Sequence, residues 1–241
     1  MSTYRELIYI VLDELKSISD DSIIQQEHVI FLLDKYRTFV LKQKYSDIKK
    51  EIPDSNYQTI CVDLTKEEAF EGDPCDGYYL ESVQKIPDLL TLSAPKVTTI
   101  DFFSGNITYV NRERFKYVGG NKYLKNIIYS TISPSQHLYL KSTNPQYLHL
   151  NKVRVTGIFE DSSKASELSC DSNDDNCNLL DRTFPLEEAL IPVMLQYIIK
   201  ELGGVNYRPA DKLNNANDDL STMMNFIRNN MKNDFQKEIS E

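Results

Sequence analysis

The sequence lacks tryptophan and contains only eight glycines and three histidines among its 241 residues. It also lacks long apolar runs, because no segment approaches the roughly 20 consecutive apolar residues that a membrane-spanning helix requires. The first segment has no basic stretch followed by an apolar stretch, so we expect no secretion signal. These absences favour a globular chain that is made in a cytoplasm and has no membrane partner.

Cysteine is scarce as well, with four residues at irregular spacing, Cys61, Cys75, Cys170 and Cys177. This pattern does not match the disulfide framework of a small secreted protein, so we expect free thiols. A disulfide between Cys170 and Cys177 is the alternative. Zinc is not expected at that pair, because no second pair or nearby histidine completes a set of four ligands.

The motifs of common active sites are missing. The sequence contains no dinucleotide or phosphate-binding glycine loop, no G-x-S-x-G turn and no H-E-x-x-H helix. Residues 171–175 resemble the start of a calcium loop, but Asn176 and Arg182 stand where glycine and a bidentate glutamate are required. We therefore expect no catalytic residues, no cofactor and no bound metal, and structural roles for His28, His137 and His149.

Basic residues are outnumbered, with 27 Lys and Arg against 36 Asp and Glu and a net charge of −9. This balance disfavours a DNA-gripping surface, because such surfaces neutralise phosphates. It is compatible with a conduit through which DNA slides without sticking. The main basic stretch contains Arg37, Lys42, Lys44, Lys49 and Lys50. We interpret this stretch as a solvated helix face or a subunit contact.

Helical periodicity marks both ends of the chain. It predicts a helix over residues 3–16, started by a Thr3–Glu6 capping box, and a longer helix over residues 25–46. A third helix is predicted from Pro185, kinked at Pro192 and stopped by Gly203-Gly204, and a fourth helix follows beyond residue 220.

The middle of the chain reads as strands, because Tyr, Thr, Val and Ile form short runs between turn residues. The predicted strands are residues 57–64, 96–102, 107–110, 127–132, 137–141 and 152–159, of which 127–132 and 137–141 are expected to form a hairpin.

Together these patterns predict an α+β fold, with a helical bundle body made from both chain ends and a β-rich insertion between them. The predicted domains are the first part of the helical body (1–50), the β-rich insertion (51–160), an acidic exposed loop (161–181), the second part of the helical body (182–219) and an extended or helical C-terminal arm (220–241).

The C-terminal arm carries an apolar stripe that a self-contained core does not require. Its members are Met223, Phe226, Ile227, Met231 and Phe235. They follow a polar linker, and methionine-rich faces adapt well to partners. We predict that this stripe docks on a neighbouring chain, and packing in the core of the same subunit is the alternative.

Six segments carry a resemblance to a known family: residues 4–8, 27–37, the 144–145 turn, the end of the following strand at 158–161, residues 184–190 and residues 214–220. In these segments the chain resembles the head–tail connector proteins of crAss-like bacteriophages. The resemblance spans nearly the whole chain and is closest to the ring protein that sits beneath the portal. The resemblance rests on the order of these segments along the chain and on how much of the chain they span, since none of them is a catalytic motif.

The resemblance implies a structural protein of the virion without enzymatic activity. It implies a ring of about twelve copies in the phage neck that joins the portal above to ring or tail proteins below and lines the DNA channel. The alternatives are another ring or tail-hub component, a metal-dependent nuclease that uses Asp171, Asp174 and Asp175, and a monomeric β-rich ligand-binding module.

Overall fold

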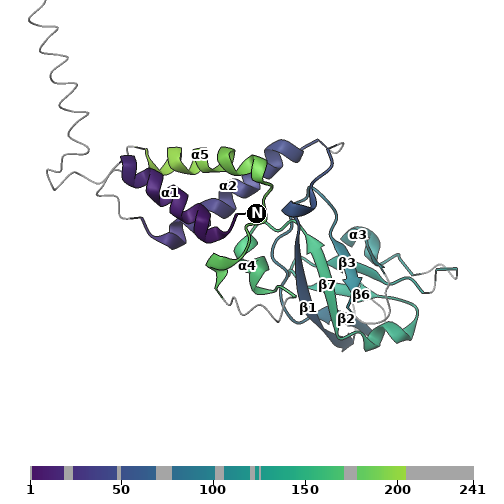
Figure 1. Cartoon of the computed structure of the whole chain (residues 1–241). Helices are drawn as coiled ribbons and strands as arrows, with labels where there is room; N and C mark the ends of the chain where they lie inside the picture. The colour runs from purple at the N-terminus through teal and green to yellow at the C-terminus, as the bar shows by residue number, and fades with distance from the viewer. Residues whose placement is uncertain are drawn as a thin grey trace, which may run out of the picture.

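The computed structural model describes residues 2–18, 24–47, 50–68, 78–100, 106–119, 123–124, 126–170 and 178–204. Figure 1 shows two parts side by side, a layer of helices and a β-barrel. The short helix α4 lies between them, and the N-terminus lies near the junction.

The helical layer contains α1 (Tyr4–Ile18), α2 (Gln26–Tyr45) and α5 (Ile191–Leu202). The capping box is confirmed, because the Thr3 amide donates to Glu6 Oε2 at 2.9 Å and the Glu6 amide donates to Thr3 Oγ1 at 3.2 Å. The predicted ranges of these first two helices are also confirmed to within two residues. Helices α1 and α2 both pack against α5.

The expectation of a helix starting at Pro185 and kinked at Pro192 is wrong. Residues 188–190 form a 3-10 turn, η4 (Glu188–Leu190), and α5 starts after it with Pro192 in the first turn. A proline is tolerated there because the first amides of a helix have no intrahelical acceptor, so α5 needs no kink. Helix α5 ends as predicted, with Gly203 as its C-cap.

The barrel is built from β1 (Gln58–Glu68), β2 (Tyr78–Ser82), β3 (Lys96–Thr99), β4 (Asn106–Tyr109), β5 (Tyr129–Ile132), β6 (Leu138–Lys141) and β7 (Lys152–Gly157). These strands close in the order β1-β2-β6-β5-β4-β3-β7. The β5–β6 hairpin is confirmed, with Ser130 opposite Leu140. Strand β2 was not predicted.

Closure depends on the long strand β1. Its first half pairs with β7, from Gln58 opposite Gly157 to Asp63 opposite Lys152, and its second half pairs with β2, starting with Leu64 opposite Ser82. The parallel β4–β5 pair completes the circle. A closed circle leaves no unpaired edge strand, which would otherwise be a template for pairing with other chains.

Each part has its own hydrophobic core. The barrel is filled by alternate residues of its strands, including Ile60 and Val62 of β1, Leu138 and Leu140 of β6 and Val153 and Val155 of β7. The helical core gathers the inward faces of α1, α2 and α5 around Phe184 and Leu186. A small third cluster, Tyr79, Phe115 and Tyr129, lies under α3 (Arg112–Phe115).

The predicted fold class is therefore wrong. The strand-rich segment is not an insertion into a helical bundle body, because it forms a closed barrel with its own core. The predicted loop over residues 161–181 is also wrong in part, since α4 (Ser162–Glu167) starts directly after Asp161. The Asp161 carboxylate caps that helix by accepting from the Lys164 amide at 3.0 Å.

The expectation of free cysteines fails for two of the four. Cys61 on β1 and Cys170 beyond α4 form a disulfide, with their Cα atoms 4.8 Å apart. The Cys61 amide also donates to the Leu168 carbonyl at 2.8 Å, which holds the two segments together. Cys75 and Cys177 lie outside the described residues.

Candidate interaction surfaces

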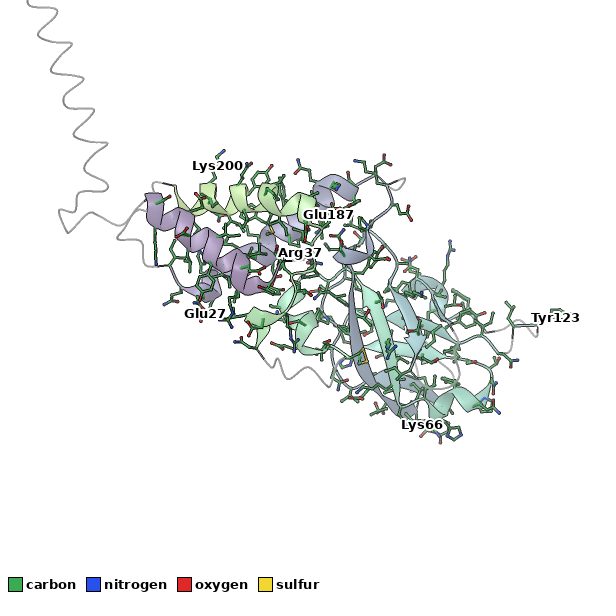
Figure 2. The ribbon with its side chains drawn as sticks, in the orientation of Figure 1. Glu27, Arg37, Lys66, Tyr123, Glu187 and Lys200 are labelled. Carbon is green, nitrogen blue, oxygen red and sulfur yellow. A yellow bond between two sulfur atoms is a disulfide. The ribbon has the colours of Figure 1, made fainter. Side chains whose placement is uncertain are left out.

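A buried arginine joins the helical layer to the barrel. Arg37 of α2 has no exposed surface, and Figure 2 shows it between the two parts. Its guanidinium donates to the Pro185 carbonyl at 2.8 Å, the Phe159 carbonyl at 2.7 Å and the Asn56 carbonyl at 3.2 Å. Burial lowers the pKa of Arg37 to about 10, so it stays charged at neutral pH.

A carboxylate lies next to this arginine. Asp34, also on α2, accepts hydrogen bonds from the hydroxyl and the amide of Ser162, at the start of α4. The Tyr4 hydroxyl of α1 lies 2.6 Å from the same Ser162 hydroxyl. Burial raises the pKa of Asp34, while the charge of Arg37 opposes that rise. We call Arg37, Asp34, Ser162, Tyr4 and Asn56 the polar joint.

The interpretation of the basic stretch as a solvated face or subunit contact is wrong for Arg37, which is buried. Lys42 and Lys44 lie at the surface, where Lys42 pairs with Glu160 at 3.0 Å and Lys44 pairs with Glu187. Arg37 lies one helical turn from both Leu33 and Leu41, which are buried. This helical spacing places residue 37 on the buried face of α2. The sequence interpretation placed it at the surface nevertheless, because its side chain is charged.

Aromatic side chains gather on the exposed side of α2 and α5. Tyr36 stacks on Tyr197 with centroids 5.8 Å apart, and Phe39 meets Tyr197 edge-on at 5.5 Å. The Phe39 side chain is 48% exposed, and Val193 lies one turn before Tyr197 and is also exposed. We call Tyr36, Phe39, Val193 and Tyr197 the aromatic face. Tyr36 and Tyr197 are half-buried against the helical core, and Phe39 and Val193 form the exposed part. Exposed apolar side chains that lie together in this way often mark a protein contact.

A second exposed set lies on the barrel. Tyr117 and Tyr123 are 75% and 81% exposed, and Leu124, which follows Tyr123 in the sequence, is also exposed. Tyr123 lies at the end of the barrel away from the helices (Figure 2). We call Tyr117, Tyr123 and Leu124 the barrel tip. The molecule thus exposes apolar side chains on two separate parts.

A groove of about 610 Å³ runs between α2 and the barrel. Its walls come from α2, the 87–88 loop, Gln136 and the start of α4. Five carboxylates line it, Glu27, Asp34, Asp88, Glu160 and Asp161, against two lysines, Lys35 and Lys164. Phe31 lies in the groove wall and is 63% exposed. We call this feature the joint groove.

The residues predicted to bind a partner, Met223, Phe226, Ile227, Met231 and Phe235, lie outside the described residues. The same holds for Asp171, Asp174 and Asp175 of the calcium-like loop. Within the described part of the chain, no group of three or more His, Cys, Asp or Glu side chains is placed to hold a metal ion. No helix in that part is long and apolar enough to cross a membrane.

Comparison with known proteins identifies the family. Residues 6–220 match the family described as phage tail ring protein 2. The chain is also 54% identical over 220 residues to Ring protein 2 of Bacteroides phage crAss001, and this match covers 90% of the chain and 98% of that relative. The resemblance to crAss-like phage ring proteins is confirmed by both matches. The chain belongs to the phage tail ring protein 2 family of crAss-like phages.

Proposed function

We propose that this chain is a structural subunit of a ring in the phage neck, in which about twelve copies connect the portal to the tail and line the DNA channel. The proposal rests on the near full-length similarity to Ring protein 2, which covers 98% of that relative. In this role the chain has no enzymatic activity, and its partners are copies of itself, the portal above and tail proteins below.

The exposed surfaces suit such an assembly. A cyclic ring uses heterologous contacts, in which one patch of each subunit meets a different patch of the next. The aromatic face and the barrel tip are exposed on different parts of the molecule and differ in composition. This separation supports a subunit with two distinct neighbour contacts.

The charge suits a channel. With a net charge of −9, the chain as a whole repels the DNA backbone, so a lumen lined by it retains passing DNA weakly. Binding of double-stranded DNA to the assembled ring is expected to be weak at physiological salt, which a filter-binding or mobility-shift titration measures.

The C-terminal arm is part of this proposal. The stripe of Met223, Phe226, Ile227, Met231 and Phe235 supplies a contact with the portal or a neighbouring subunit. Deleting residues 220–241 is expected to leave a folded protein that no longer assembles with the portal. Normal co-assembly of the shortened chain would contradict this role.

Native mass spectrometry of the full chain, alone and mixed with the portal of the same phage, tests the proposal. A ring, or recruitment of about twelve copies by the portal, is the expected result. A chain that forms rings and ignores the portal would indicate another ring or a tail-hub component. A chain that remains monomeric under both conditions would contradict the ring proposal.

A further inference from the structure

We propose that the cavity between α3 and the turn from β5 to β6 binds a phosphate group, which a free nucleotide or the DNA backbone would supply. The cavity has a volume of about 1050 Å³ and lies beside α3, which Figure 1 shows on the barrel. Its described wall residues belong to α3, β5, β6 and the segments next to them. Because they all come from one subunit, phosphate binding here does not require the proposed ring. We call this feature the α3 cavity.

Two cations line the α3 cavity. Arg112 starts α3 and Lys116 is its C-cap, so a spacing of four residues places both on the same side of the helix. In the described part of the chain, neither side chain forms an ion pair. Glu113 is the one carboxylate among the described wall residues, so the wall carries an excess of positive charge in a chain whose net charge is −9.

A buried hydroxyl in the same wall has no partner. Thr131 of β5 is 2% exposed, and its Oγ1 forms no hydrogen bond within the described part of the chain. Thr131 pairs with Tyr139 of β6, and both residues line the cavity. Leaving a buried hydroxyl unpaired is destabilising, and native proteins usually satisfy such a group with protein, water or a ligand. The cavity is the place from which a ligand can supply that partner.

The Thr131 hydroxyl can reach the cavity without movement of the backbone. Rotation about χ1 moves the hydroxyl and the methyl group between the same staggered positions. Because Thr131 is a wall residue, such a rotation turns its hydroxyl towards a ligand in the cavity.

The turn between the two strands adds further donors. The hydroxyls of Ser133 and Ser135 lie 2.6 Å apart, and both residues line the cavity. One hydroxyl hydrogen forms that bond, so the hydrogen of the other hydroxyl remains for a second acceptor. A guanidinium, an ammonium group and hydroxyls together are donors to which phosphate oxygens bind well. The volume also leaves room for the sugar or base attached to a phosphate.

The expected affinity is low. Both cations lie on exposed side chains, where salt screens their charge, so we expect a dissociation constant of about 1 mM at low ionic strength. Binding this weak agrees with a channel that does not retain DNA.

Methyl NMR of the full chain, with labelled threonine and isoleucine methyl groups, tests the site. The probes are inorganic phosphate, deoxyadenosine monophosphate and a short DNA duplex, each compared with sodium chloride at equal ionic strength. We expect saturable shifts of the methyl signals of Thr131 and of its neighbour Ile132 that sodium chloride does not reproduce.

Three variants identify the residues responsible. Arg112→Gln combined with Lys116→Gln should raise the dissociation constant by about tenfold or more. The matched control Arg114→Gln removes a cation of the same helix that is not among the wall residues, so it should change the constant by less than about twofold. Thr131→Val keeps the shape and removes the hydroxyl. It should weaken binding by about threefold to tenfold without lowering the urea midpoint, because no hydrogen bond within the protein is lost.

Each outcome decides for or against the site. Shifts no larger than those in sodium chloride would overturn it. Equal weakening by Arg114→Gln and by the double variant would show diffuse attraction between charges and would also overturn it, as would Thr131→Val that lowers the urea midpoint and leaves binding intact. Tighter binding of the mononucleotide than of the duplex indicates a free nucleotide, and the reverse order indicates the DNA backbone; both orders uphold the phosphate site.

Discussion

Replacing Arg37 by methionine should destabilise the protein severely, because it would leave three backbone carbonyls without their donor. The guanidinium donates hydrogen bonds to the carbonyls of Asn56, Phe159 and Pro185, and the Arg37 side chain has no exposed surface. Methionine fills a similar volume but donates nothing. Each buried acceptor left unsatisfied costs about 1–3 kcal/mol.

Part of that cost is offset, since a charge no longer has to be buried. For a buried charged group removed from its partners, the net loss is about 3–5 kcal/mol. Unfolding free energies of natural domains are about 5–15 kcal/mol, so the variant should fold but with little margin. Urea titration followed by circular dichroism at low temperature measures the loss.

The loss should also depend on pH. Burial raises the pKa of Asp34 above its ordinary value of 3.8, and the charge of Arg37 opposes the rise. A carboxyl group with a raised pKa in the folded state destabilises that state as pH rises through the interval between the two values. Removing Arg37 raises the pKa of Asp34 further, so Arg37→Met should lose more stability at pH 7 than near pH 4.

Two further variants test the reasoning. Arg37→Lys keeps the charge but not the planar fork of donors, so its loss should be intermediate. Arg112→Met removes an exposed arginine of α3 and should change stability by less than about 0.5 kcal/mol. A loss of under 1 kcal/mol for Arg37→Met, about the value of one ordinary hydrogen bond, would refute the account of the joint.

Three more predictions follow from the described contacts. The Cys61–Cys170 disulfide closes a loop with a sequence separation of 109 residues, so its reduction, or the variant Cys61→Ser, should lower the unfolding free energy by about 3–5 kcal/mol. Matched urea titrations with and without reductant measure this loss. An unchanged midpoint would contradict the crosslink. A hydrogen bond from Tyr36 lowers the pKa of Glu201 below its ordinary value of 4.5. The stability that this carboxylate contributes is therefore complete above pH 4.5 and is lost as the pH falls through the lower pKa of the folded state. Glu201→Gln should make the unfolding free energy fall less steeply with decreasing pH in this acidic range. Phe39→Ser on the aromatic face should cost about 1 kcal/mol or less but weaken ring assembly in native mass spectrometry, whereas equal assembly would exclude this face as a contact.

Helices and hairpins were predictable from the sequence where a single short-range pattern determines them. Helices α1 and α2 carry long apolar stripes, and the Thr3–Glu6 box starts the first of them. The β5–β6 hairpin joins two strands through the short Ser133-Pro134-Ser135 turn, so its pairing is local in sequence. Such features depend on residues a few positions apart.

Barrel closure was not predictable in the same way. It requires β1 to leave β7 and pair with β2 partway along its length, and β4 to pair in parallel with β5. Alternation of side chains gives the same pattern in an open sheet and in a closed one, since it depends only on which face is buried. The pairing of Cys61 with Cys170 depends on α4 packing against β1, two segments about one hundred residues apart, so it was missed because it is equally non-local.

The polar joint links the fold to the proposed assembly. In a ring of about twelve copies, successive subunits are rotated by roughly 30°, and closure depends on keeping that angle. A subunit that contacts its neighbours through both the helical layer and the barrel can hold the angle only if the two parts do not move against each other. Apolar packing alone is non-directional, whereas three hydrogen bonds from one planar guanidinium to separate backbone segments fix direction as well as distance. Removing Arg37 is costly because it leaves buried carbonyls unsatisfied, but compared with apolar packing a buried charge contributes little net stability. The orientation that Arg37 imposes on the two parts therefore explains its presence better than the stability does.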